Sequence, residues 1–555
     1  MKRYESDQKL TRRQWLMVGG LFGLYIVLRL LAWKSTILLE DHDSISYLDY
    51  TSVFRRFSLR EIFDLSPDST PAYPLFSALF SLPLGSVEAG ARLCSLFFSG
   101  LLFWALFGIG QRIGRWRETL TGLTLLAFSA PLISLSIGVL TEPTYIALVY
   151  CGFWLFLAQY EAPNYWMAVF LGCVFGLTFL TRTEGILYLA FVPLLQTGHL
   201  VLSRAHRYGL RRLVGWSLAF ALAFALVSAP QVWRVSRKLG SFAINGRQVW
   251  SLIMNRPDGK SYDEKVYGLD YGQAQINLEY IRDHSDIQAE LTSVFNPAEY
   301  IKRVVVNAED LYEIQLGVLI GPLVLIVFAL GLLVLYRRNS VETSLLLAFI
   351  LLAVIAPLLH NVVIRHIAVI LPMVLVVAGT GAWAAIEWIR EVHSFEVLSE
   401  TLLASLVVAV LVAGDGPSLR RVFNGAALDR WSNREYRPAD LERPAEMVRQ
   451  IADSALQRRP VVSARKSYLA HMAGAKQVWL PYTDYAGLVT YAALNEVDFV
   501  FLEYYFLQQY PFLEQFSRDS LDGHFVLLYV GQHSTGHRLE LYRFRSDGSE
   551  LSQRQ

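Results

Sequence analysis

The chain has 555 residues, of which 54% are hydrophobic and 18% are charged, and its mean hydropathy is +0.34. A soluble protein of this length carries fewer apolar residues and more charge. The formal net charge is only +2 and no nucleic-acid-binding motif is present, so composition excludes an electrostatic case for nucleic acid as a partner. All three cysteines fall inside apolar runs, which is typical of small core residues rather than of a disulfide framework.

The apolar residues gather into runs of about 18 to 22 residues, the length that a helix needs to cross a hydrocarbon core of about 30 Å. We therefore predict a mainly α fold, a polytopic bundle of about eleven transmembrane helices. The first run is too long for the core of a cleaved signal peptide, and no small-residue cleavage site follows it. The predicted spans are 14–33, 88–110, 118–138, 142–160, 165–181, 185–203, 212–233, 315–336, 342–360, 366–388 and 397–414.

Basic residues predict the orientation of these spans, because cytoplasmic loops are enriched in lysine and arginine. The basic N-terminal segment and the clusters at 112–117, 204–212 and 337–338 fall on one side if every run crosses once. We therefore expect a cytoplasmic N-terminus in the inner (plasma) membrane. The opposite, external side then receives two long loops, 34–87 and 234–314, and everything after the last span. Prolines among aromatic residues predict that the first loop forms short helices on the membrane surface.

The character of the sequence changes after residue 415. We divide the chain into a transmembrane domain, 1–415, and a small extracytoplasmic α/β domain, 416–555. Alternating strands and helices predict a mainly parallel sheet. No glycine-rich phosphate loop is present, so we assign this domain no cofactor. The predicted strands are 460–463, 477–480, 498–502, 525–529 and 540–544, with helices at 444–457 and 486–494.

Ionisable residues at the ends of membrane spans are costly and therefore mark candidate sites. Five such clusters fall on the predicted external side. Carboxylates and cations that meet at one membrane face are what an enzyme needs to hold a phosphate headgroup and to deprotonate an acceptor beside it. The clusters are Glu40–Asp41–His42–Asp43, Thr141–Glu142–Pro143, Arg182–Thr183–Glu184, Arg234 with Arg237 and Lys238, and His360–Asn361 with Arg365–His366.

Four of the five clusters also have a plain structural explanation. Glu142 suits the start of a helix, where a carboxylate meets exposed N–H groups. Arg182 and Glu184 could pair only with each other, and Arg365 with His366 could anchor a helix at the interface. The run 40–43 could be a solvated charge run, although crowded carboxylates raise at least one pKa, which suits a base.

A divalent cation is a further option for the first cluster, because carboxylate and imidazole groups suit such ions. Asp41, His42 and Asp43 are adjacent on one loop, however, and adjacent residues rarely complete a site alone. We therefore assign no metal ligands.

These motifs resemble the C-type glycosyltransferases that use polyprenyl-phosphate sugars, in the branch of the protein O-mannosyltransferases and lipid A aminoarabinose transferases. They follow one another in the family's order between residues 14 and 375. The mannosyltransferase branch often has Asp-Glu where this chain has Asp43-Ser44, which leaves the branch and the donor open. The motifs are Asp43-Ser-Ile-Ser-Tyr47, Pro71-Ala-Tyr73-Pro74, Ala91-Arg92-Leu93, Thr141-Glu142-Pro143, Thr181-Arg182-Thr183-Glu184-Gly185, and Arg365-His366 before Leu371-Pro372.

The resemblance implies a module of about seven helices with the active site between the first loop and the membrane. It implies that Asp43 is the base that deprotonates an acceptor hydroxyl for inverting attack on the anomeric carbon, a contribution of about 10²–10⁴-fold. Glu142 is the second catalytic candidate and would orient a hydroxyl. Positive charge must stabilise the leaving phosphate, and Arg182 and Arg365 are the candidates because an arginine fork is well suited to phosphate. The candidate substrate-binding residues are Asp41, Tyr47, Tyr73, Arg182, Glu184, Arg365 and His366.

We therefore predict an integral-membrane glycosyltransferase with a polyprenyl-phosphate sugar donor. Its acceptor is a lipid, a glycan or a protein, and membrane lipids surround it. An oligosaccharyltransferase is disfavoured because its acidic metal-binding pattern is only partly present. A secondary transporter would show broken helices and an internal repeat, whereas the charges here lie at helix ends and no repeat is found. A non-catalytic protein of lipid-linked glycan assembly is the third hypothesis.

Overall fold

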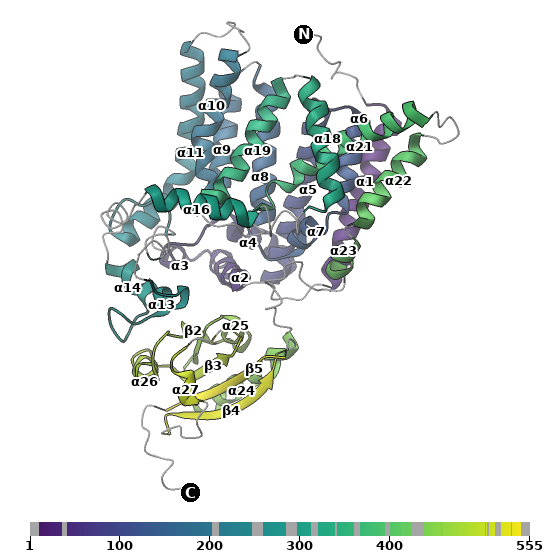
Figure 1. Cartoon of the computed structure of the whole chain (residues 1–555). Coiled ribbons are helices and arrows are strands. Elements are labelled where there is room, and N and C mark those ends of the chain that lie inside the picture. The colour runs from purple at the N-terminus through teal and green to yellow at the C-terminus, as the bar shows by residue number, and fades with distance from the viewer. Residues whose placement is uncertain are drawn as a thin grey trace.

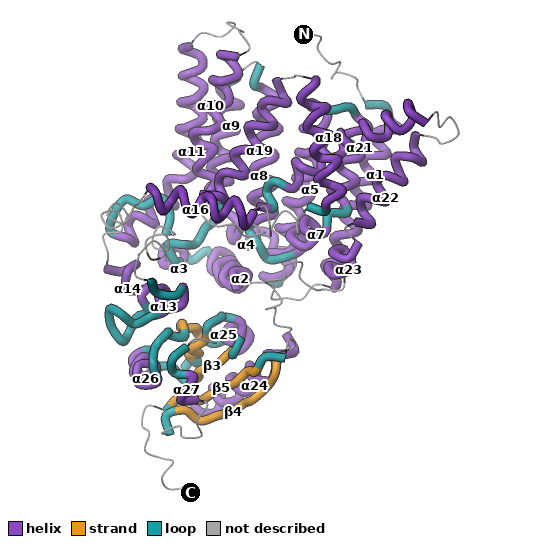
Figure 2. Tube along the Cα trace, in the orientation of Figure 1, coloured by secondary structure: helices purple, strands orange, loops and turns teal. Residues whose placement is uncertain are grey.

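The computed structural model combines a large helical bundle with a small sheet domain at one end (Figure 1, Figure 2). We call that end of the bundle the domain end. The residues that the structure describes are 10–35, 42–161, 163–202, 210–246, 253, 259–284, 297–311, 320–338, 341–359, 367–393, 400–414, 416–423, 438–456, 458–505, 507, 510–516, 523–533 and 536–545.

Every predicted span corresponds to a helix or to a pair of helices, so the chain is a multi-pass membrane protein of mainly helical fold. Within the described residues, four of these helices are long and apolar enough to cross a membrane, or five if one bent pair forms a single span. The four are α1, α5, α11 and α21. The helices of the bundle are α1 (Arg12–Ser35), α5 (Val87–Ile113), α6 (Trp116–Ala127), α7 (Ala130–Ile137), α8 (Glu142–Gln159), α9 (Tyr165–Thr181), α10 (Leu187–Leu202), α11 (Leu210–Leu239), α18 (Pro322–Arg338), α19 (Val341–Leu359), α21 (Leu371–His393) and α22 (Glu400–Gly414).

The prediction of one uninterrupted helix over 118–138 is wrong. The segment forms α6 and α7, which meet at a bend of 61°. Pro131 lies in the first turn of α7. Proline has no N–H to continue the hydrogen bonds of a preceding helix, so a helix that reaches it from α6 must break and start again.

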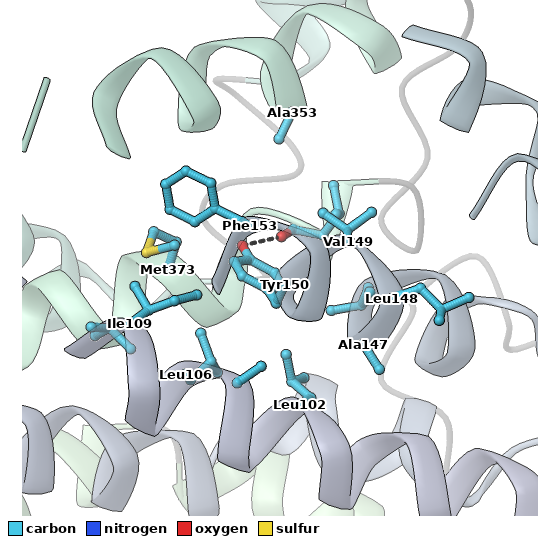
Figure 3. Close-up of a cluster of buried hydrophobic side chains, with 14 of the residues drawn as sticks. Leu102, Leu106, Ile109, Ala147, Leu148, Val149, Tyr150, Phe153, Ala353 and Met373 are labelled. Atoms are coloured by element: carbon cyan, nitrogen blue, oxygen red, sulfur yellow. Dashed lines mark hydrogen bonds between the residues drawn. The ribbon is translucent and has the colours of Figure 1, made fainter. Parts of the chain in front are cut away.

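The core of the bundle forms where α5, α8 and α21 meet (Figure 3). Tyr150 on α8 is buried there, and its hydroxyl donates a hydrogen bond of 2.6 Å to the carbonyl oxygen of Val369, just before α21. The phenol is therefore satisfied inside an apolar layer, as a buried polar group must be. The surrounding side chains include Leu102, Leu106, Ile109, Val149, Phe153 and Met373.

Close backbone contacts hold α21 between α18 and α6. A Cβ atom on Gly381 would overlap the carbonyl oxygen of Val327 on α18, and one on Gly379 would overlap the backbone of Gly122 on α6. Small residues at such crossings let two backbones approach without a side chain between them, which is how helices pack in membranes.

We predict that Gly381→Val lowers the thermal midpoint of the detergent-purified protein, because the added side chain must push α21 off α18. Gly20→Val on α1 is the control, since nothing lies within 4 Å of a Cβ at that position. Circular dichroism on heating measures both variants. Equal midpoints for Gly381→Val and Gly20→Val would contradict the close crossing.

The loop between α1 and α5 consists of short helices, as its prolines and aromatic residues predicted. They are α2 (His42–Arg55), α3 (Leu59–Asp64) and α4 (Ala72–Leu84), and α4 packs on both α2 and α5. The second long loop contributes α13 (Tyr262–Tyr267), α14 (Asn277–His284) and α16 (Pro297–Asp310). Figure 1 shows α2, α3, α13 and α14 together at the domain end.

The sheet domain contains all five predicted strands within a few residues of their expected positions. The sheet order is β2-β1-β3-β5-β4. The prediction of a mainly parallel sheet is wrong, because β1 pairs in parallel with β2 and β3 while β5 is antiparallel to β3 and β4. Only five residues separate β4 from β5, a connection too short for a parallel crossover. The elements are α24 (Pro438–Ala455), β1 (Val461–Ala464), α25 (Tyr468–Ala473), β2 (Lys476–Trp479), α26 (Tyr485–Leu494), β3 (Phe499–Glu503), α27 (Leu513–Phe516), β4 (Phe525–Gln532) and β5 (Arg538–Phe544).

One short helix follows the last span before the sheet domain begins. This helix, α23 (Gly416–Phe423), packs on the bundle, where Val422 joins a buried cluster with Ala32 of α1 and Ala130 of α7. The domain boundary at 415/416 stays a prediction.

Candidate functional site

A buried group of three charged side chains lies where α8 and α9 meet. Arg182 follows the last residue of α9, Glu142 is the first residue of α8, and Glu184 lies in the short 3-10 helix Thr183–Ile186. One guanidinium nitrogen of Arg182 lies 2.5 Å from Glu142 Oε1 and another lies 3.0 Å from Glu184 Oε1. Arg182 and Glu142 are almost completely buried, at 5% and 2% exposed. Sequence alone left open a pair of Arg182 with Glu184, and the structure adds Glu142 as a second carboxylate.

The backbone at Arg182 explains why the sequence places these charges together. The helix α9 ends at Thr181, and Arg182 takes an extended conformation that turns the chain back on itself. Gly185 lies against the backbone of Phe179, where a side chain would not fit. The Thr-Arg-x-Glu-Gly motif therefore forms a tight turn from which the side chains of Arg182 and Glu184 both point into the bundle.

Tyrosines from three helices surround the ion group. The guanidinium carbon of Arg182 lies 5.8 Å from the ring centre of Tyr145 on α8. Tyr47 on α2 is close enough to interact electrostatically with Arg182, and its ring meets that of Tyr73 edge to face at 5.6 Å. Tyr73 on α4 donates to the carbonyl of Ala91 at 3.1 Å. The first loop therefore reaches the ion group through its tyrosines.

Asp43 lies in the first turn of α2 and is partly buried. It precedes Tyr47 by four residues, so the two side chains share one face of the helix. Tyr50 is on the same helix, and its pKa is raised to about 12 by burial first and then by Asp68 and Asp49, with a further contribution from Asp43. These three carboxylates of the first loop interact electrostatically with this phenol, and Arg234 opposes their effect.

Arg234 is a candidate cation because it follows a predicted span. It binds the first loop and does not join the ion group. Its guanidinium donates to the carbonyl oxygens of Leu65 at 2.7 Å and of Ser69 at 3.2 Å, and to the Ser69 hydroxyl at 2.8 Å. Lys238, one turn further along α11, donates to the carbonyl of Leu65 at 2.7 Å. The end of α11 therefore fixes the turn that joins α3 to α4.

Arg29 on α1 is a buried charge that the sequence analysis missed. It is 0% exposed, lies over the ring of Tyr25 at 3.3 Å, and donates to Ser99 Oγ at 3.2 Å and to the carbonyl of Ala127 at 3.4 Å. That carbonyl is the last of α6, where the broken span leaves acceptors unsatisfied. A lone arginine inside the apolar run 14–33 was the signal that could have revealed it.

Three of the predicted site residues, Asp41, Arg365 and His366, lie outside the described residues, as do His360 and Asn361. The described part of the chain contains no group of three His, Cys, Asp or Glu side chains that could hold a metal ion. The side chain of His42 is also outside the described set. The cation option for residues 41–43 therefore stays a hypothesis.

We predict that Arg182→Lys lowers the thermal midpoint, because an ammonium cannot reach two carboxylates in the way that a planar fork does. Arg212→Lys is the matched control. Arg212 on α11 donates to the backbone carbonyl of Pro163, which joins α8 to α9 at their other ends. Differential scanning fluorimetry compares the two. A midpoint lowered no further by Arg182→Lys than by the control would contradict the bridging geometry.

We predict that Arg234→Ala exposes the first loop to protease, because the carbonyls of Leu65 and Ser69 lose their donor. Arg237→Ala is the control, as Arg237 is exposed on the same helix and lies over the ring of Trp233 at 5.7 Å. Limited proteolysis followed by mass spectrometry locates the cuts. Equal cleavage within residues 59–70 in both variants would show that Arg234 does not hold the loop.

Part of the chain matches a known protein family. Residues 68–233 match the family described as dolichyl-phosphate-mannose-protein mannosyltransferase. The matched segment runs from the first loop into α11 and contains Tyr73, Glu142, Arg182 and Glu184. No curated protein sequence matches the chain significantly.

Solved structures resemble the chain over nearly its whole length. The archaeal oligosaccharyltransferase AglB from Archaeoglobus fulgidus, in complex with an inhibitory peptide and a dolichol-phosphate, is similar with a TM-score of 0.59 at 12% identity, over 95% of this chain and 74% of that one. ArnT from Cupriavidus metallidurans, bound to undecaprenyl phosphate, is similar with a TM-score of 0.52 at 12% identity, over 97% and 99%. These comparisons confirm the resemblance to C-type glycosyltransferases, at the level of the fold.

Proposed function

We propose that this chain is an integral-membrane glycosyltransferase that moves a sugar from a polyprenyl-phosphate donor to an acceptor hydroxyl. The observation that carries the proposal is the meeting of α2, which bears Asp43 and Tyr47, with the buried group of Arg182, Glu142 and Glu184. The family match and the shared fold support glycosyl transfer as the reaction class. The polyprenyl phosphates bound to two proteins of the same fold support the donor class.

In this mechanism Asp43 accepts the proton of the acceptor hydroxyl. The acceptor oxygen forms a bond to the anomeric carbon, the bond from that carbon to the phosphate oxygen breaks, and the electron pair leaves with the polyprenyl phosphate. Attack from the face opposite the leaving group inverts the configuration. A positioned base of this kind contributes about 10²–10⁴-fold to the rate.

The charge balance of the ion group suggests its role. Arg182 already holds two carboxylates, so the group carries a net charge of −1 when all three side chains are ionised. Such a group attracts hydroxyl donors more readily than a phosphate, because ionised carboxylates only accept hydrogen bonds. We therefore propose that Glu142 and Glu184 orient hydroxyls of the sugar or acceptor, with Arg182 fixing them. Arg365 stays the proposed partner of the leaving phosphate. Arg182, the other arginine proposed for that role, is instead proposed to hold the two carboxylates.

The distribution of basic residues supports the proposed orientation in the membrane. Arg338 at the end of α18 donates to Glu118 at 2.8 Å, and Arg115 donates to Glu387 at 2.7 Å. Two of the basic clusters therefore meet at one end of the bundle, opposite the sheet domain (Figure 1). We propose that this end faces the cytoplasm, which places α2 and the ion group on the extracytoplasmic side.

The break between α6 and α7 is one feature that a transporter would share. Here, however, the carbonyl of Ala127 at the break receives a hydrogen bond from Arg29, and the sequence contains no internal repeat. The carbonyl freed by the break is therefore satisfied within the protein, and we retain sugar transfer as the proposed function.

We predict that Asp43→Asn lowers sugar transfer about 10²–10⁴-fold, because the amide cannot accept the proton. The measurement is transfer of labelled sugar from polyprenyl-phosphate donors in proteoliposomes that contain the full chain. Asp64→Asn is the control, since Asp64 is an exposed carboxylate of the same loop. Unchanged transfer by Asp43→Asn would overturn the assignment of the base.

A further inference from the structure

The helix α2 presents two different faces to two different parts of the protein. Consecutive residues of a helix are about 100° apart, so side chains two positions apart point in nearly opposite directions. Asp43 and Tyr47 share the face that turns toward Tyr73 and the bundle. Ile45 and Asp49 share the other face. The side chains of Asp43, the proposed base, and of Ile45 therefore face different parts of the protein.

The second face of α2 is occupied by the sheet domain. Ile45 is 1% exposed and belongs to the domain's own apolar core, together with Leu469 of α25, Phe499 of β3 and Leu541 of β5. The carboxylate of Asp49 lies 3.7 Å from Nδ1 of His471, also on α25. Both members of this pair are substantially exposed, and such pairs stabilise little. The buried isoleucine is therefore the main contact.

A second contact fixes the domain to the loop that follows α11. Arg465 pairs with Asp263 at 2.7 Å, donates to the hydroxyl of Tyr267 at 2.9 Å and lies 4.0 Å from the centre of that ring. The backbone N–H of Tyr482 donates to the carbonyl of Tyr267 at 2.8 Å. Two separate contacts prevent the domain from pivoting about either one.

The two loops are also tied to each other beneath the domain. Besides the contacts of Arg234 and Lys238, the backbone N–H of Gly246 donates to the carbonyl of Pro67 at 3.3 Å. A Cβ on Gly246 would collide with Asp68, so this approach needs glycine. The sheet domain, the second loop and the first loop thus form one connected layer over the domain end of the bundle.

We propose that the sheet domain is a positioning element for α2, with Ile45 and Arg465 as positioning residues that set where Asp43 stands relative to the ion group. The proposal rests on the proposed function in taking Asp43 as the base, whereas the docking of the domain does not depend on it. A base must stand within hydrogen-bond reach of its proton, and a displacement of about 1 Å can cost about 10²-fold in rate.

The test uses the full chain in proteoliposomes with four substitutions, of which Arg465→Met loosens the second contact. Ile45→Asp places a charge in the domain core, Ile45→Val keeps an aliphatic side chain there, and Val530→Asp is the matched control on the half-exposed face of β4. Hydrogen–deuterium exchange of residues 468–473 measures docking. The kcat of transfer and the KM for the donor measure positioning.

We expect Ile45→Asp to raise exchange in 468–473 and to lower kcat at least tenfold with little change in the donor KM, because the groups that hold the donor stay in place. Ile45→Val and Val530→Asp should behave like the unmodified protein. Arg465→Met, which loosens the second contact, should change exchange and kcat in the same direction. A melting transition of the bundle equal to that of the unmodified protein shows that Ile45→Asp is folded.

Each contrary outcome has a definite meaning. Unchanged exchange in Ile45→Asp would overturn the docking. Raised exchange with unchanged kcat would overturn the positioning role, as would a raised donor KM with unchanged kcat, which would make the domain a substrate-binding element. Absence of transfer by the unmodified protein would overturn the proposed function, and the positioning role with it, while exchange would still decide the docking.

Discussion

The buried guanidinium of Arg182 is the constraint on which the site depends. A buried charge is tolerated only when it is paired, and here the pairs come from the start of α8 and from the turn after α9. Arg29 and Arg234 donate instead to neutral acceptors, the carbonyls and hydroxyls of other segments. These three buried arginines therefore join segments that lie far apart in the sequence.

These joints set the geometry of the proposed chemistry. Arg182 holds two carboxylates in a fixed relation, and Arg234 holds the turn that leads into α4. The ring of Tyr73 on α4 then meets Tyr47, one helical turn beyond Asp43. Side-chain contacts of the first loop thus connect the proposed base to the ion group. A site that is assembled across loops in this way requires support from both sides of α2, because packing on α4 restrains only one face.

The sequence predicted the helices, the five strands and the short helices of the first loop, because each is a local property of apolar period and turn residues. Motif spacing also identified Arg182 and Glu184 together. It did not identify Glu142 as the second partner of Arg182, since the two lie 40 residues apart and only packing of α8 on α9 brings them together. The break before Pro131 and the antiparallel half of the sheet were missed because both depend on connections shorter than the elements that they join.

The similarity to solved proteins at 12% identity indicates which parts of this design are general and which are particular to the chain. At such a distance the fold persists while individual contacts do not, so the contact of Ile45 with the domain core must be argued from this sequence. Its isoleucine lies two residues after Asp43, on a helix whose other face carries Tyr47. A polar residue at position 45 would suit a solvated helix equally well. The docked domain explains why position 45 holds a fully buried aliphatic side chain. Because the domain docks beside the proposed base, it can affect the reaction without contacting the substrate.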